Sequence, residues 1–192
     1  MKRLTSKEDG PSDPGWTRRR WMQGSAGAAA FGWVGRAMAQ AVSAAAEEAQ
    51  APPMPALGRQ LQVPSVRLLN NTVYEPAQSA GQFLLVYWWS STCPFCALQS
   101  PSMEKLWQQQ RSKGLQMLAL SIDRKPELAS AYLIQKGYTF PTAWASPEWR
   151  RGFPKPKGLP ITLLCGRDGR LLLAEKGQLF PEDVGAMAQL MV

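Results

Sequence analysis

The feature that most constrains the fold of this chain is an apolar run that ends at two cysteines. Residues 83–89 read FLLVYWW, without polar alternation and with mostly aromatic or branched side chains. Such a run is typical of a strand that is buried on both faces of a sheet. The hydroxyl residues at 90–92 can cap a helix, and Pro94 suits a first helical turn because its missing N–H would have no partner there. We therefore expect Cys93 at the N-terminus of a helix that follows a buried strand directly.

The spacing of the two cysteines, Cys93-Pro94-Phe95-Cys96, predicts a dithiol/disulfide pair that exchanges with other thiols. A helix N-terminus carries partial positive charge, which stabilises the thiolate, and the thiolate is the form that reacts. Cys93 is therefore the predicted nucleophile. Cys96 lies one helical turn further on, so it can attack a mixed disulfide formed at Cys93 and release the substrate with both of its sulfurs reduced.

Two other uses of a C-x-x-C pair are disfavoured. A zinc site needs four ligands, but the chain has no histidine and Cys165 is the only other cysteine. A purely structural disulfide rarely opens a helix directly after a buried strand, so redox chemistry is favoured. Cys165 is expected to be a small buried apolar residue rather than a third redox thiol. We accordingly expect no bound metal and no cofactor.

Composition limits the size of the fold and the class of partner. The chain has 192 residues, 45% of them hydrophobic, which is enough for one domain with its own core. The net charge is +8, but no basic stripe with interleaved aromatic residues accompanies it, so nucleic acid is not an expected partner. A single small domain without an obvious extra apolar face is expected to be a monomer.

Residues 1–39 are predicted to be an export signal. The segment TRRRWMQ at 17–23 resembles the twin-arginine motif, with the arginine pair at Arg18 and Arg19. A Gly/Ala-rich run at 24–35 follows, shorter than the roughly 20 apolar residues that a membrane span requires. Ala37-Met38-Ala39 has the form of a cleavage site, so removal of the signal after Ala39 is favoured over an uncleaved tether. The predicted destination is the periplasm, where disulfides persist.

The remaining chain divides into a flexible Ala/Pro-rich linker over 40–60 and a domain over 61–192. The domain is expected to open with a strand or hairpin turning at Asn70-Asn71. After the central strand, we expect a helix over 94–111, a strand over 115–122, a helix over 126–136, a short strand within 139–145, a loop over 148–158, a hairpin of strands 161–165 and 170–175, and a helix over 181–191. Inward-facing helix residues are predicted from helical spacing; they are Leu98, Met103, Leu106, Trp107, Leu128, Tyr132, Leu133, Val184, Met187 and Leu190.

Several segments, in this order, resemble the exported TlpA/ResA/DsbE-like thiol-disulfide oxidoreductases of the thioredoxin superfamily. The segment WSSTCPFC at 89–96 matches W-x-x-x-C-x-x-C, and Pro101 matches a proline in the helix after it. LSID at 120–123 and GLPIT at 158–162, with RDGR at 167–170, resemble the later segments of that group. The resemblance covers 61–192 and implies an α/β, thioredoxin-like fold with a central mixed β-sheet flanked by helices.

The resemblance also implies a substrate groove beside the cysteines. Pro160 would be a cis-proline that faces them, although an ordinary trans-proline at the start of a strand is the alternative. A cis peptide costs little only before proline, and the backbone beside it can pair with an extended substrate segment. Trp89, Pro94, Phe95 and Leu159 would line this groove.

Two departures from the group leave the proton chemistry open. Tyr87 stands where many thioredoxins carry a buried carboxylate, and Gln99 stands where the ResA-like branch carries a glutamate. Such carboxylates tune cysteine pKa values and move protons. Asp123 and Glu175 are the remaining candidates for a proton acceptor, and both are expected to be solvated charges.

The resulting hypothesis is an exported thiol-disulfide oxidoreductase that reduces disulfides in partner proteins and is recycled by a membrane thiol-disulfide exchange protein. Pro94 after the first cysteine resembles the oxidising periplasmic enzymes, so a disulfide oxidase or isomerase that uses the same cysteines stays open. A non-catalytic copper-chaperone module is a further alternative, because Cu(I) accepts two thiolates.

Overall fold

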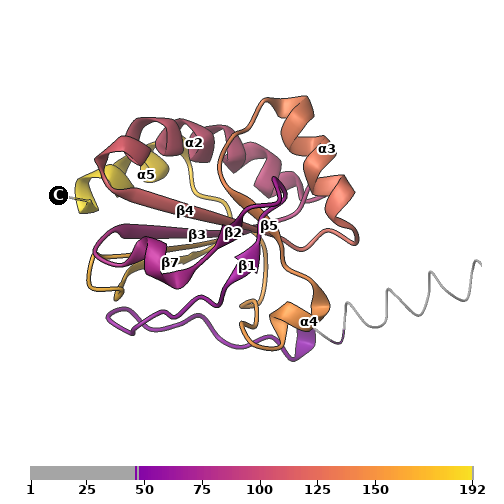
Figure 1. Cartoon of the computed structure of the whole chain (residues 1–192), viewed down its shortest axis with the longest axis horizontal. Helices are drawn as coiled ribbons and strands as arrows, with labels where there is room; N and C mark the ends of the chain where they lie inside the picture. The colour runs from indigo at the N-terminus through magenta and orange to yellow at the C-terminus, as the bar shows by residue number, and fades with distance from the viewer. Residues whose placement is uncertain (1–45, 47, 192) are drawn as a thin grey trace, which may run out of the picture. The chain divides into compact units, whose positions relative to one another are not determined.

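The computed structural model describes residue 46 and residues 48–191, which form a layered α/β unit (Figure 1). In this part of the chain, a five-stranded mixed sheet has the order β5–β4–β3–β6–β7. Its strands are β3 (Phe83–Trp89), β4 (Leu115–Ser121), β5 (Thr142–Trp144), β6 (Ile161–Cys165) and β7 (Leu171–Lys176). The strand β3 pairs parallel with β4 and antiparallel with β6. The predicted hairpin of the last two strands is confirmed by the antiparallel pairing of β6 with β7.

The central strand β3 is buried over its whole length, as predicted. Because side chains alternate along a strand, Leu85, Tyr87 and Trp89 enter one hydrophobic core, and Val86 and Trp88 enter a second core on the opposite face of the sheet. This two-sided burial explains why the sequence of β3 has no polar positions.

The helices α2 (Pro94–Gln110), α3 (Pro126–Lys136) and α5 (Pro181–Ala186) cover the first core, on the upper side of the sheet in Figure 1. Two 3-10 helices, η2 (Arg111–Lys113) and η3 (Met187–Leu190), extend α2 and α5. Gly137, with φ of 68°, ends α3 at the predicted residue.

Three of the predicted inward-facing residues are wrong. Leu98 is 62% exposed, Leu128 46% and Leu190 45%. In α2 the buried residues lie at helical spacing along one face; they are Cys96, Gln99, Ser100, Met103 and Leu106. Leu98 lies off this stripe, and a polar side chain takes the inward position next to it.

The second core is covered by the segment before β3 and by the chain between β5 and β6. The predicted hairpin at the domain start is present as β1 (Val66–Arg67) and β2 (Val73–Tyr74), with η1 (Pro76–Ser79) after it. The prediction that 148–158 is entirely loop is wrong at its start, because α4 spans Pro147–Arg150. The Ser146 hydroxyl caps α4 by accepting from the N–H of Trp149. The Trp149 and Phe153 rings then pack on Trp88, with ring centroids 6.2 Å and 5.8 Å away.

The described end of the predicted linker contacts the rest of this unit. Lys155 Nζ lies 3.0 Å from a carboxylate oxygen of Glu48, and the Gly58 N–H donates to the Leu171 carbonyl over 2.8 Å. The division into a linker over 40–60 and a domain over 61–192 stays a prediction. The export signal and the cleavage site after Ala39 lie outside the described residues. None of the helices in the described ranges is both long enough and apolar enough to span a bilayer.

Candidate active site

The two cysteines lie where β3 gives way to α2, as predicted from the sequence. Cys93 is the N-cap residue of α2, and its sulfur accepts a hydrogen bond from the Cys96 N–H over 3.3 Å. Its carbonyl accepts from Ala97 in the first turn of the helix, over 3.0 Å. The Cys93 sulfur therefore receives a donor at the helix N-terminus, the arrangement that stabilises a thiolate.

The two thiols differ in exposure. Cys93 is partly exposed, Cys96 is buried, and neither is in a disulfide. Burial raises the pKa of the Cys96 thiol far above its ordinary value. Its hydrogen bond with Cys93, the charge of Cys93 and the charge of Asp123 raise that pKa further, whereas a backbone hydrogen bond with Ser90 lowers it. A substrate can therefore reach Cys93 first, while Cys96 is held as a thiol beneath it.

Asp123 follows β4 and is only 4% exposed, so the prediction that it is a solvated charge is wrong. The Ser90 hydroxyl donates to its carboxylate over 2.7 Å, and the Ser121 hydroxyl does so over 2.8 Å. Ser91 donates from its N–H over 3.1 Å and from its hydroxyl over 2.8 Å. This carboxylate thus ties the end of β4 to the turn that leads into Cys93. Glu175, the other candidate, is exposed as expected.

The two residues that replace the carboxylates of related groups are both buried. The Tyr87 hydroxyl lies 3.2 Å from that of Ser100, and the Ser100 hydroxyl donates to the Cys96 carbonyl over 2.7 Å. Burial raises the pKa of Tyr87 well above its usual value, so it is a neutral phenol. Gln99 donates to the Thr162 hydroxyl over 2.9 Å and accepts from the Leu179 N–H over 2.8 Å. Gln99 therefore joins α2 to β6 and to the segment before α5.

The peptide bond between Leu159 and Pro160 is cis, so the trans alternative is wrong. The register places Ile161 opposite Trp88, so Pro160 lies at the end of β3 from which the turn to Cys93 leaves. Pro160 is buried and Leu159 is partly exposed. Leu159 and Cys93 both pack against the core that contains Cys96.

The other predicted groove residues differ in position. Phe95 is 55% exposed and Pro94 is also exposed, so both can meet a partner. Trp89 is fully buried, with its ring centroid 5.5 Å from that of Tyr132 and 6.2 Å from that of Phe140. This position argues against the predicted contact of Trp89 with substrate. It makes Trp89 a packing residue beneath the dithiol.

Sequence reasoning missed the serines of the Asp123 network. The sequence patterns identify Ser90 and Ser91 only as capping residues and Ser121 only as part of a strand. The available signal is the close spacing of Ser121 and Asp123 at the end of a predicted buried strand.

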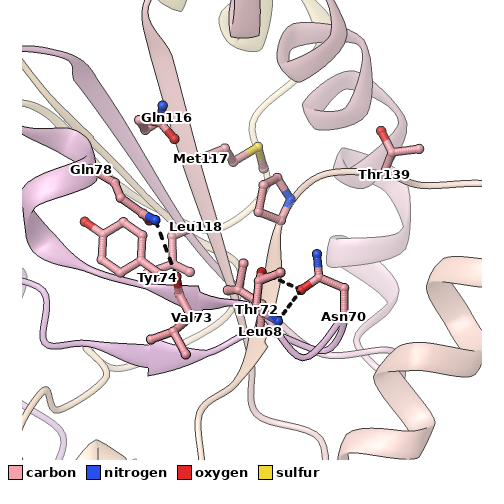
Figure 2. Close-up of a pocket in the computed structure, with 11 residues that line it drawn as sticks. Leu68, Asn70, Thr72, Val73, Tyr74, Gln78, Gln116, Met117, Leu118 and Thr139 are labelled. Atoms are coloured by element: carbon pink, nitrogen blue, oxygen red, sulfur yellow. Dashed lines mark hydrogen bonds between the residues drawn. The ribbon is translucent and has the colours of Figure 1, made fainter.

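The described residues offer no second site of comparable chemistry. A pocket of about 630 Å³ lies by the β1–β2 hairpin, lined by residues such as Leu68, Tyr74 and Met117 and by no cysteine (Figure 2). Its polar side chains are largely bonded to nearby groups; the Asn70 side chain, for example, accepts from Thr72. No group of three or more potential metal ligands occurs within residues 48–191. Cys165 is buried, as expected, and burial raises the pKa of its thiol to about 12.

Comparison with solved structures supports the thioredoxin-like fold. A thiol:disulfide interchange protein from a Bacteroides species has a TM-score of 0.63 at 17% identity, over 71% of this chain and 90% of that one. A protein assigned as thiol:disulfide interchange protein DsbE from Chlorobium tepidum has a TM-score of 0.61 at 26% identity, over 70% of this chain and 94% of that one. The fold is therefore thioredoxin-like, as the resemblance implied.

Comparison of sequences gives the family. The thiol-disulfide oxidoreductase ResA of Bacillus thuringiensis is 25% identical over 92 residues, which are 48% of this chain and 53% of that protein. The chain thus spans about half the length of the curated relatives that it matches. The AhpC/TSA family matches residues 59–171, a segment that includes both cysteines, Asp123 and Pro160. Because this match covers more than half of the sequence, the chain belongs to the AhpC/TSA family.

Proposed function

We propose that this protein is a thiol-disulfide oxidoreductase that reduces disulfides in partner proteins through Cys93 and Cys96. The observation that supports this most directly is the pairing of a partly exposed thiol at the start of α2 with a buried thiol one turn further on. The similarity to ResA, a thiol-disulfide oxidoreductase, and to the DsbE protein, a thiol:disulfide interchange protein, adds to this support.

The proposed reaction has two exchange steps. The Cys93 thiolate attacks one sulfur of a substrate disulfide, which forms a mixed disulfide and releases the other substrate sulfur as a thiolate. Cys96 then attacks the Cys93 sulfur, which forms the Cys93–Cys96 disulfide and releases the second substrate sulfur. Two electrons pass from the dithiol to the substrate. The proton of Cys96 goes to the second departing sulfur, and the proton that Cys93 lost to solvent on ionising is replaced on the first substrate thiolate from solvent.

The surface around Cys93 suits a protein partner. Phe95 and Leu98 expose 55% and 62% of their surface on the outer side of α2. The partly exposed Leu159 next to the cis peptide is proposed to line the other side of the site. An extended segment that carries the substrate cysteine would pair with the backbone here, as in other cases of strand addition.

We further propose that the protein is exported to the periplasm and that a membrane thiol-disulfide exchange protein recycles it. The twin-arginine-like segment at 17–23 supports export. A protein that reduces disulfides would also act in a compartment where disulfides form.

The first test is reduction of a model disulfide protein, insulin, by the full-length chain with dithiothreitol as electron source. The wild type is expected to accelerate the reaction, and Cys93→Ser is expected to abolish it. Cys96→Ser is expected to accumulate a mixed disulfide at Cys93, visible by mass spectrometry. Cys165→Ser is the matched control and is expected to keep the activity. Equal activity of Cys93→Ser and wild type would refute the proposal, as would Cu(I) binding by a wild type that shows no exchange.

The direction of electron flow is tested by the equilibrium between the dithiol and a glutathione or dithiothreitol series. A potential near about −270 mV, the range of reducing thioredoxins, is the expected result. A potential near about −120 mV, the range of strong periplasmic oxidants, would instead make the same cysteines a disulfide donor.

A further inference from the structure

Asp123 is a buried carboxylate that the proposed exchange steps do not use. It is 4% exposed, and serine groups from two segments of the chain donate to it. They are the Ser90 hydroxyl, the Ser91 N–H and hydroxyl, and the Ser121 hydroxyl. An ionised carboxylate only accepts hydrogen bonds, so this set of donors fits the charged form. Donors of this kind hold a charge in place without a neutralising cation.

The contacts of Asp123 lead to the dithiol. Ser90 and Ser91 belong to the turn between β3 and α2, and the Cys93 N–H donates to the Ser90 carbonyl over 3.2 Å. Ser90 also hydrogen-bonds the Thr92 hydroxyl over 3.0 Å. On its other side, the Asp123 carbonyl accepts from the Trp144 indole over 2.7 Å. The backbone of Asp123 is thus anchored to β5 while its side chain holds the turn that carries Cys93.

We propose that Asp123 is a positioning residue for the dithiol: it holds the Ser90–Ser91 turn and places a fixed negative charge at the turn that leads into Cys93 and Cys96. The inference rests on the proposed exchange function, since it assigns a role within the same site. The charge disfavours a free Cys96 thiolate. Cys96 therefore keeps its proton until the mixed disulfide forms and the departing substrate sulfur can take that proton.

The other groups around Cys96 do not supply such a charge. Tyr87 from β3 and Tyr132 from α3 face the pair, and burial raises the pKa of both phenols, so they are neutral. Cys93 is the remaining titratable neighbour within the site. Glu104 on α2 and Lys155 before the cis peptide are partly buried, but each is bonded elsewhere, to Thr139 and to Glu48. The charged residues on α3, on α5 and directly after β4 are exposed, where solvent screens them; they are Arg124, Lys125, Glu127, Lys136, Glu182 and Asp183.

The test is a pH titration of Cys96 in full-length reduced protein labelled with ¹³C at the cysteine Cβ atoms, which reports each cysteine separately. In Asp123→Asn, the titration of Cys96 is expected to begin about one pH unit lower than in the wild type, because a neighbouring like charge is lost. Glu175→Gln removes an exposed carboxylate at the same edge of the sheet and is the matched control, with no expected shift. An unchanged Cys96 titration in Asp123→Asn would overturn the inference, even if that variant were less stable.

A second variant keeps the inference falsifiable should Asp123→Asn fail to fold. Ser121→Ala removes one donor but leaves the carboxylate charged, so Cys96 is expected to titrate at the wild-type pH or above it. A fall in that pH would overturn the inference, because the charge would then not be what raises it.

A kinetic readout links the charge to the exchange itself. Wild type and Asp123→Asn are converted to the mixed disulfide of Cys93 with glutathione, and the release of glutathione by Cys96 is followed at several pH values. A pKa about one unit lower makes the Cys96 thiolate about tenfold more abundant, but a thiolate of lower pKa is also less nucleophilic. Glutathione is therefore expected to be released about threefold faster in Asp123→Asn than in the wild type. Release at the wild-type rate or slower would count against the charge role. If the titration shifts but the wild type never exchanges with glutathione, the proposed function fails while the assignment of the charge stands.

Discussion

Replacing Gln99 by methionine tests whether a buried amide joins the active-site helix to the sheet. The side chain is 1% exposed, donates to Thr162 over 2.9 Å and accepts from Leu179 over 2.8 Å. Methionine has a similar volume and fits a helix equally well. The substitution therefore removes the two hydrogen bonds with little change in packing.

The expected loss follows from the two groups left behind. The Thr162 hydroxyl is fully buried and loses its partner, and the Leu179 N–H is partly buried and loses its acceptor. A buried polar group without a partner costs about 1–3 kcal/mol. Water can reach Leu179 in part, and methionine is more apolar than glutamine, so the net loss in the free energy of unfolding is expected to be about 2–3 kcal/mol.

The assay is equilibrium unfolding of the reduced full-length protein in urea, followed by circular dichroism. With a slope of about 1–3 kcal/mol per molar urea, the midpoint of Gln99→Met should fall by about 0.7–3 M. Gln109→Met, at an exposed position on the same helix, is the matched control and should lie within about 0.5 kcal/mol of wild type. A Gln99→Met protein as stable as that control would refute the reasoning.

Three further predictions concern charge and exposure. Glu104 accepts from the Gln108 side chain and from the backbone of Thr139 and Phe140, and these hydrogen bonds outweigh its partial burial and hold its pKa low. Glu104→Gln should therefore lose about 1–2 kcal/mol at pH 7 and should approach wild type as the pH falls below about 4. A pH-independent difference in urea unfolding would contradict this. The pKa of Cys96 is raised in the folded protein, so this thiol ionises at a lower pH in the unfolded chain. The free energy of unfolding of the reduced protein should therefore fall above about pH 9, and that of Cys96→Ala should fall less. Parallel pH profiles of unfolding free energy for the two proteins would contradict this. Phe95→Ala, at a residue 55% exposed, should leave stability within about 0.5 kcal/mol of wild type but slow insulin reduction, and an unchanged rate would exclude Phe95 from the partner surface.

Most of the element order could be predicted because it depends on signals between neighbours along the chain. Residues 83–89 are apolar throughout, and Gly137 ends α3 in a left-handed conformation. The errors in the predicted inward-facing helix residues arise because a hydrophobic pattern indicates roughly which face of a helix is buried, but not how deeply each residue on that face is buried. Leu98 and Gln99 are adjacent, and their apolar or polar character favours Leu98 for the inner face although the buried stripe runs through Gln99. Partners on β6 and before α5 decide that Gln99 is the buried one.

Local sequence also determined the central piece of the candidate site, a cysteine pair at the start of a helix that follows a buried strand. Only the tertiary structure decided what surrounds that pair. The register of β3 with β4 brings Trp89 opposite Ser121, and this places Asp123 beside the Ser90–Ser91 turn. The same packing buries Trp89 under α3. Which residues meet across strands depends on the register of the sheet, and the register depends on many weak contacts between segments that are far apart in the sequence. A local sequence pattern contains no information about those contacts.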